Sequence, residues 1–153
     1  MKNIVTILLI ALSFTANAQE QKIKPTDLPA DVFAFIQTNF KETVIKTASK
    51  ETKKKTGLST YSVVLENKTE LAFKDTGSWK KIDGKGTPIP VSLVPTPFWD
   101  YIKKNYPQQE VTKIDKGPEE ILVKLVNGTE LVFNIHGKFV RVQKVEVIEK
   151  SDK

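Results

Sequence analysis

Apolar residues recur along this chain with two spacings, and segments with one spacing alternate with segments that have the other. In residues 28–40 and 94–106 the apolar positions lie four apart, a spacing that favours a helix with one buried face. In residues 61–74 and 121–133 apolar and polar residues alternate, which is typical of strands buried on one side. The helical apolar positions are Val32, Ile36 and Phe40 in the first segment and Phe98, Ile102 and Tyr106 in the second. We therefore expect two helices, each followed by strands.

Short turns divide the alternating segments into hairpins. Asn127-Gly128 is the strongest hairpin signal in the chain, because both residues readily take the positive φ angles of a two-residue turn. A further strand is expected to start near Trp79 in the first half and near Phe139 in the second. Shorter strands are expected before the hairpins, at residues 44–48 and 110–114. The pattern predicts an α+β unit of one helix plus about four antiparallel strands.

The two halves also match residue by residue. Residues 28–40 align with residues 94–106 at an offset of 66, with Pro, Ile and Asn in identical places. Residues 67–73 align with residues 127–133 at an offset of 60. The offset falls by six because the first half carries a longer loop around residues 50–59. The chain is thus predicted to be a tandem repeat of the same α+β unit.

A leader precedes the repeats. Residues 1–18 have the features of a signal peptide, with a charged Lys2, an apolar stretch at residues 4–14 and a small-x-small cleavage site that ends at Ala18. An uncleaved membrane anchor is the alternative, but the apolar stretch is short for a bilayer core of about 30 Å. We expect repeat 1 at residues 19–83, a linker at 84–93, repeat 2 at 94–149 and a disordered tail at 150–153. Polar residues 19–27 are also expected to be disordered.

Composition limits the chemistry that the chain can perform. Its 153 residues include no cysteine and one histidine, and the formal net charge is +6. Disulfides, thiolate metal sites and thiol catalysis are therefore excluded, and an exported chain without cysteine favours a bacterial periplasm. A unit of about 60 residues buries too little apolar surface to be stable alone, so the two copies are expected to share a sheet or a core.

The polar residues do not form a catalytic pattern, so we predict no enzyme and no cofactor. His136 lies in an expected turn without a nucleophile beside it, and a solvated turn residue is the favoured interpretation. Asp75 and Asp83 could offer oxygen atoms to calcium, but their spacing is unlike an EF-hand. Glu70 and Glu130 recur in the same Thr-Glu-Leu segment and are interpreted as cross-strand partners of lysines.

The lysines at residues 53–55 form a short basic run in the longer loop of the first copy. No aromatic residues are interleaved with them for base stacking, so nucleic acid is not an expected partner. A solvated loop tip is the favoured interpretation, and weak attraction to anionic surfaces is the alternative.

The outer strand face of the second copy is the candidate binding surface. It carries apolar residues at positions where the first copy is mostly polar, and an apolar patch of this kind suits a partner. Alternatively, residues 140–148 fold over this patch. The candidate binding residues are Leu122, Lys124, Val126, Val132, Trp79 and Phe139.

The motifs of the two copies resemble those of a known family. Residues 28–40 read Leu-Pro-x-x-Val-x-x-Phe-Ile-x-x-Asn-Phe, residues 64–73 form an alternating hairpin, and residues 77–79 read Gly-x-Trp. Residues 88–95, Pro-Ile-Pro-Val-Ser-Leu-Val-Pro, introduce the second copy. This pattern resembles the PepSY-like, beta-lactamase-inhibitor-like family of exported bacterial proteins. The resemblance implies a tandem repeat similar to the beta-lactamase inhibitor protein fold and an inhibitory role toward a protease or hydrolase, and it carries no catalytic residues.

Two hypotheses for the function follow. The first is a non-enzymatic periplasmic binding module that engages a protein or peptide through an antiparallel sheet face, as an inhibitor of a protease or hydrolase. The second is an envelope sensor component that binds a small ligand or calcium between the repeats. Neither hypothesis requires nucleic acid or a membrane span in the mature chain.

Overall fold

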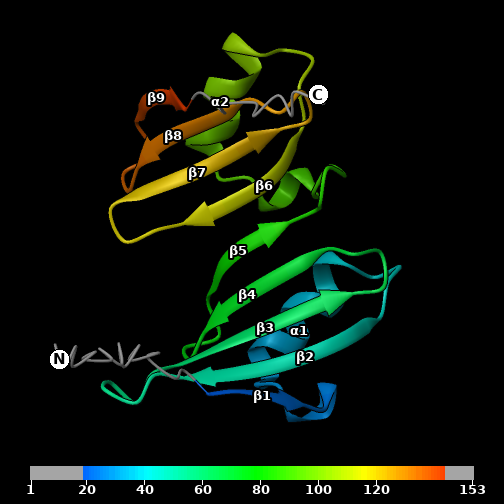
Figure 1. Cartoon of the computed structure of the whole chain (residues 1–153). Coiled ribbons are helices and arrows are strands. Elements are labelled where there is room, and N and C mark those ends of the chain that lie inside the picture. Colours follow the sequence, from blue (N-terminus) through cyan, green and yellow to red (C-terminus); the bar gives the residue numbers. More distant parts are fainter. Residues whose placement is uncertain (1–18, 144–153) are drawn as a thin grey trace, which may run out of the picture.

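Each strand of the protein pairs with the strand that follows it in the chain (Figure 1). The computed structural model describes residues 19–143, and within them nine strands form one antiparallel sheet in the order β1 to β9. The signal peptide expected at residues 1–18 and the tail expected at 150–153 lie outside the described residues. Among residues 19–143, no helix is both long and apolar enough to cross a membrane.

The elements occur as two similar sets. The first set comprises α1 (Ala30–Asn39), β2 (Ile45–Thr52), β3 (Ser59–Leu65), β4 (Glu70–Lys74) and β5 (Trp79–Asp83). The second set comprises α2 (Thr96–Asn105), β6 (Val111–Lys116), β7 (Glu120–Leu125), β8 (Glu130–Asn134) and β9 (Phe139–Gln143). The predicted α+β class, with one helix and four antiparallel strands in each unit, is confirmed.

β-Bulges provide structural support for the duplication. Lys46 is the extra residue where β2 pairs with β3, and Thr112 is the extra residue where β6 pairs with β7. Lys80 and Val140 are the extra residues where β5 and β9 pair with their preceding strands. Lys46 and Thr112 are 66 residues apart, and Lys80 and Val140 are 60 residues apart. These are the same two offsets that the sequence alignment gives. Because a bulge changes the twist and direction of a strand, both units have the same local sheet shape.

The first strand was not expected. β1 (Gln19–Ile23) and the short helix η1 (Pro25–Asp27) occupy residues that the sequence indicated as disordered, so that prediction is wrong. β1 pairs with β2 along its whole length, and the Ser49 hydroxyl donates a hydrogen bond of 2.8 Å to Glu20. The strand is polar on both faces except for Ile23, because it lies at the edge of the sheet, and no alternation therefore marks it in the sequence.

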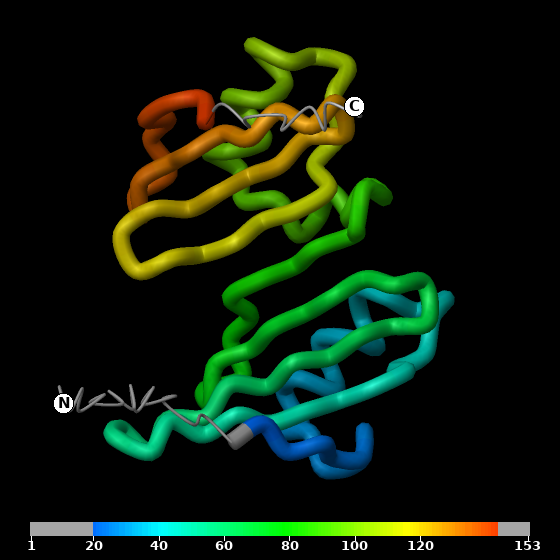
Figure 2. Tube along the Cα trace, viewed as in Figure 1, coloured from blue at the N-terminus to red at the C-terminus, as the bar shows by residue number. Residues whose placement is uncertain are grey.

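Both helices cover the same face of the sheet, and the core lies between them and the strands (Figure 2). One row of paired core residues crosses five strands, and every member is almost fully buried. The row consists of Leu71, Ile82, Ile114, Val123 and Leu131. Because Ile82 belongs to the first unit and Ile114 to the second, the core is continuous between the units. The expectation that the two copies share a sheet is confirmed.

The two units meet where β5 pairs with β6. Only three residues of each strand are paired, residues 81–83 with residues 113–115. The connection after β5 follows β6 closely, since Gly84 and Ile89 donate backbone hydrogen bonds of 2.8 and 2.9 Å to β6 carbonyl groups. A short helix, η2 (Val91–Leu93), then leads into α2. At the other end of the pairing, beyond Lys81 and Asp115, β5 and β6 separate (Figure 2).

Candidate functional site

The side of the sheet opposite the helices is the candidate site. In Figure 1 both helices lie behind the strands, and within residues 19–143 no helix covers the front. We call this front the open face. It is formed by the side chains that alternate with the core residues along β3 to β9, namely Ser62, Val64, Glu70, Ala72, Lys81, Asp83, Lys113, Asp115, Leu122, Lys124, Glu130, Val132 and Arg141.

Three of the six sequence-predicted residues lie together on this open face. Leu122 on β7 pairs with Val132 on β8, and Lys124 lies two residues further along β7. Leu122 is partly exposed, but only 2% of Val132 is accessible to solvent. Val126, 51% exposed, lies in the turn that follows β7. The apolar part of the open face is therefore smaller than its sequence suggests.

An ion pair crosses β8 close to Val132. Arg141 on β9 donates two hydrogen bonds, of 2.6 and 2.8 Å, to the carboxylate of Glu120 on β7. Since β8 lies between these strands, the pair must cross over β8, and Arg141 is the register partner of Val132. The hydrogen bonds from Arg141 lower the pKa of Glu120. Residues 144–148, the rest of the segment proposed to cover Val132, lie outside the described residues.

Trp79 and Phe139 lie on the helix-covered face and do not share a surface with Leu122. Phe139 stacks on Tyr101 of α2, with ring centroids 4.4 Å apart and an interplanar angle of 12°. Trp79 is the register partner of Phe73, and its ring is contacted by Lys116. The two aromatic residues occupy equivalent positions in the two units and pack against the core.

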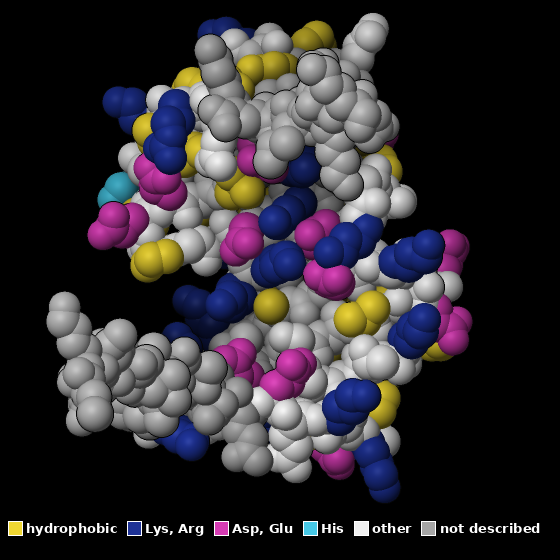
Figure 3. Space-filling view, viewed as in Figure 1, with side chains coloured by type: hydrophobic (Ala, Val, Ile, Leu, Met, Phe, Trp, Pro, Cys, Tyr) yellow, Lys and Arg dark blue, Asp and Glu magenta, His cyan; other side chains and the backbone are white. Residues whose placement is uncertain are grey.

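Charged side chains of both signs gather along the middle of the open face, where the two units meet (Figure 3). We call them the charge band, and the sequence identified only part of it. On the first unit, Glu70 contacts Lys85 at 2.8 Å and Lys81 at 3.4 Å. The hydrogen bond from Lys85 is the largest cause that lowers the pKa of Glu70. Asp83 lies within 3.7 Å of Lys85 and 3.8 Å of Lys81.

The second unit extends the charge band. Lys124 contacts Glu130 at 3.5 Å, and Lys113 contacts Asp115 at 4.0 Å. The interpretation of Glu70 and Glu130 as cross-strand partners of lysines is confirmed. The rest of the band was not predicted from the sequence, although Lys81, Lys113 and Asp115 flank the buried side chains of Ile82 and Ile114 along β5 and β6. The remaining member, Lys85, lies in the turn after β5.

The open face also has two shallow depressions. One has a volume of about 330 Å³ and lies over β3 to β6, and the other has a volume of about 230 Å³ and lies over β6 to β9. Asp115 lines both depressions. A partner that fills them would therefore contact both units at their junction.

The polar candidates His136 and Asp75 both lie in exposed turns. Within residues 19–143 no group of three or more His, Asp or Glu side chains is placed to hold a metal ion. His136 is exposed in the turn between β8 and β9, where its backbone N–H donates a hydrogen bond of 3.0 Å to Asn134. Asp75 is likewise exposed in the equivalent turn of the first unit.

Comparisons with known proteins agree with this architecture. A crystal structure described as a putative periplasmic protein from the DUF2874 family of Bacteroides vulgatus has a TM-score of 0.76 and 28% identity, and the alignment covers 82% of this chain and 97% of that one. A putative calcium-regulated periplasmic protein from Bacteroides thetaiotaomicron has a TM-score of 0.74, 28% identity and the same two coverages. A third, a putative periplasmic protein of unknown function from Bacteroides vulgatus, has a TM-score of 0.76 and 25% identity, with coverages of 82% and 100%.

Among curated proteins, none matches the chain. A family model described as "Putative beta-lactamase-inhibitor-like, PepSY-like" matches residues 59–141. The match begins at β3 of the first unit and ends in β9 of the second, so it includes the junction between the units. With more than half of its residues matched and the same fold in three similar structures, the chain belongs to the PepSY-like family.

Proposed function

We propose that this protein is an exported, periplasmic binding module without enzymatic activity, and that it engages a protein or peptide through the open face of its sheet. Inhibition of a protease or hydrolase is the role that the family description suggests. The periplasmic location is supported by the leader-like residues 1–18 and by the descriptions of the three similar structures.

The observation that carries this proposal is the charge band on the open face. A partner is recognised through such a surface by complementary charges, which contribute specificity and speed of association. The band contains both signs, so it fits the mixed surface of a protein better than the uniform negative charge of a nucleic acid. Leu122, partly exposed beside the band, adds an apolar contact.

One pair of lysines on the open face suits an acidic group of the partner. Lys113 and Lys124 lie directly opposite each other on β6 and β7, with 24% and 40% of their side chains exposed. Like charges in directly opposed positions destabilise a sheet. Asp115 and Glu130 offset part of this repulsion, and a carboxylate of the partner placed between the two ammonium groups would relieve the rest. We therefore expect the bound protein or peptide to present an acidic side chain at the Lys113–Lys124 pair.

Calcium binding is the second candidate, because one similar structure is described as a putative calcium-regulated protein. In this chain the carboxylates of Glu70 and Asp83 already contact Lys81 and Lys85. A calcium ion at that position would have to displace two ammonium groups. A rise in melting temperature with calcium chloride, absent with magnesium chloride, would favour this candidate over the first.

The test uses a partner captured from the periplasmic fraction, identified and then purified for calorimetry. Lys113→Gln combined with Lys124→Gln removes both ammonium groups and keeps a polar side chain at each position. We expect this variant to bind the partner about tenfold or more weakly, which corresponds to about 1.4 kcal/mol or more. The matched control is Lys103→Gln combined with Lys104→Gln, two exposed lysines of α2 on the other side of the molecule. Equal affinity of the open-face variant and the wild-type protein would refute the proposed surface.

A further inference from the structure

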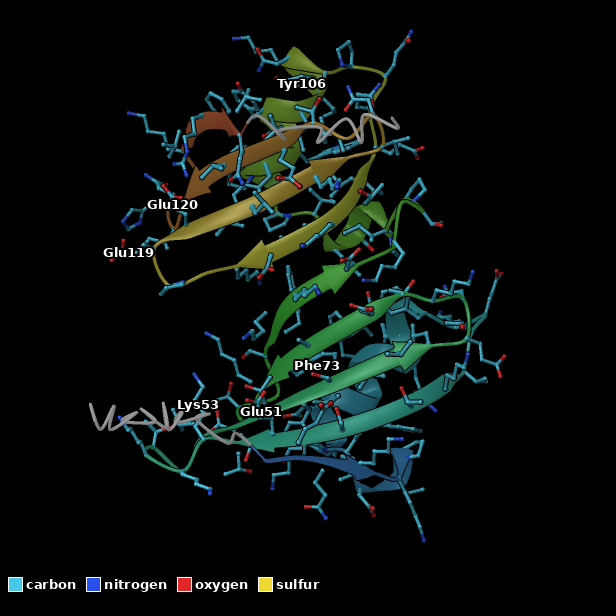
Figure 4. All side chains as sticks on the ribbon, in the orientation of Figure 1. Glu51, Lys53, Phe73, Tyr106, Glu119 and Glu120 are labelled. Carbon is cyan, nitrogen blue, oxygen red and sulfur yellow. The ribbon has the colours of Figure 1, made fainter. Side chains whose placement is uncertain are left out.

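A further concave site, with a volume of about 540 Å³, lies at the junction of the two units, where β5 begins and β6 ends. We call it the edge notch. It forms because β5 begins at Trp79 and β6 ends at Lys116, whereas their pairing stops at Lys81 and Asp115. Beyond that point the strands separate, and the loop after β2 and the turn after β6 complete the walls. Figure 4 shows Lys53 on one side of this region and Glu119 and Glu120 on the other.

Four lysines from different elements line the edge notch. Lys53 belongs to the loop after β2, Lys74 to the end of β4, Lys80 to β5 and Lys116 to the end of β6. Lys80 is the extra residue of a β-bulge, a feature that redirects side chains. The fold thus brings together four positive charges that are spread between residues 53 and 116.

These charges are poorly compensated. Asp75 is the carboxylate among the lining residues, and Glu120 at the start of β7 is held by Arg141. Among residues 19–143, none of the four lysines forms an ion pair within 4.0 Å, whereas the lysines of the charge band are all paired with carboxylates. The positive charge of the edge notch is therefore available to a ligand.

Lys116 is held in place before any ligand arrives. Its ammonium nitrogen lies 3.2 Å from the centroid of the Trp79 ring, a cation–π contact that fixes the long side chain. Burial lowers the pKa of Lys116, and the charge of Lys74 lowers it further. A bound anion would offset both effects, because it would stabilise the charged form of the lysine.

The chemistry of the lining indicates the class of ligand. Lysines bind phosphate groups as point charges, and the hydroxyl group of Thr60 adds a hydrogen-bonding partner. Lys116 lies over one face of the Trp79 ring and the ring packs against the core, so stacking of a nucleotide base on it is not favoured. The volume lies within the range of about 300–1,000 Å³ that is usual for small-molecule sites. We propose that the edge notch binds a phosphate-bearing anion, either a free phosphate compound or the phosphate headgroup of a lipid.

Pyrophosphate is the probe for the free compound, and calorimetry with the purified protein at low salt is the measurement. We expect binding with a Kd of about 1 mM or tighter, weakened by added sodium chloride because the attraction is electrostatic. Lys74→Gln combined with Lys116→Gln should weaken binding about tenfold or more, since two of four charge-assisted contacts are removed. Lys74→Arg combined with Lys116→Arg keeps the charge and should retain binding.

Two further variants separate this site from the open face. Lys113→Gln with Lys124→Gln should leave pyrophosphate binding unchanged, as should the α2 control. If the double variant that includes Lys116→Gln is unstable, Lys74→Gln alone replaces it, because Lys74 is exposed at the end of β4. This single variant should also weaken pyrophosphate binding. Failure of the proposed partner surface would not affect these outcomes.

Sedimentation with vesicles distinguishes the two phosphate sources. Phosphatidylcholine vesicles with and without phosphatidic acid are compared, using the wild-type protein and the Lys74–Lys116 variant. Binding to phosphatidic acid that is lost in the variant supports a lipid headgroup, and pyrophosphate binding that is lost in the variant supports a free phosphate compound. Absence of binding to both probes, or equal binding by the wild-type protein and the variant, would overturn the proposal.

Discussion

The Phe133 ring connects α2 to the sheet, and its truncation tests the proposed packing most directly. Phe133 on β8 is fully buried. Its ring centroid lies 4.6 Å from that of Phe98, 5.5 Å from that of Tyr101 and 5.9 Å from that of Phe139. Replacement by alanine removes the buried ring and leaves a cavity, at an expected cost of about 3–5 kcal/mol in the free energy of unfolding.

The equivalent residue of the first unit provides an internal comparison. Phe73 is also fully buried, but its described aromatic contact is a single edge contact with Phe35 at 5.4 Å. Each aromatic pair contributes about 0.5–1.5 kcal/mol beyond the area that it buries. Because Phe133 has two more such contacts than Phe73, Phe133→Ala should cost about 1–3 kcal/mol more than Phe73→Ala. Phe133→Leu keeps most of the apolar volume and provides a milder variant if Phe133→Ala does not fold.

Urea titration measures these free energies, and the two tryptophans report on the two units separately. Trp79 lies on β5 and Trp99 on α2. With Trp99→Phe only the first unit is observed, and with Trp79→Phe only the second. Because β5 and β6 join both units in one sheet with a continuous core, the two transitions should coincide.

Two results would contradict this reasoning. A cost below about 1 kcal/mol for both alanine variants would show that the aromatic residues are not core residues. Separate transitions at the two tryptophans would show that the units unfold independently despite the shared sheet.

Two further predictions concern a turn and an ion pair. Gly137 has a φ of +83°, and an added Cβ atom would lie 2.8 Å from Cβ of Pro97 on α2, whereas Gly128 has a similar φ of +85° and open space around it. Gly137→Ala should therefore destabilise the protein by about 1 kcal/mol or more beyond Gly128→Ala in urea titrations, and equal costs would contradict the close approach of turn and helix. Glu70 has a lowered pKa, chiefly through its hydrogen bond from Lys85, so the folded state binds this proton less readily than the unfolded state. The ion pair therefore stabilises the folded state above the ordinary glutamate pKa of 4.5, and this stabilisation is lost as the pH falls below that value. As the pH is lowered, the urea midpoint of Glu70→Gln should fall less steeply than that of the wild-type protein. Parallel plots of urea midpoint against pH for the two proteins would contradict this ion pair.

The sequence by itself was sufficient for the architecture of each unit. Both helices, the eight strands after them and the duplication follow from apolar spacing and from the two offsets, because helix and strand periods are local properties of the chain. The same local signal failed for β1. An edge strand with polar residues on both faces buries little, so its pairing with β2 leaves no alternation to detect.

The candidate surfaces depended much more on the tertiary structure. Sequence alternation placed Leu122, Lys124 and Val132 on one face, and the register agrees. It did not indicate that Arg141 and Glu120 form an ion pair across β8, or that Trp79 and Phe139 lie on the opposite face from Leu122.

The junction between the units shows why this information was missing. Lys81 and Asp115 are 34 residues apart and become neighbours only because β5 pairs with β6. The edge notch arises because this pairing stops after three residues, and its lysines come from four separate elements. The local alternation of apolar and polar residues predicts which face of a strand is buried. Which strand lies beside it, and where the pairing of the two strands ends, depend on contacts between residues that are distant in sequence. The sequence therefore determined the repeated unit, whereas the joining of the two units in one sheet decided where the charged side chains of the protein meet.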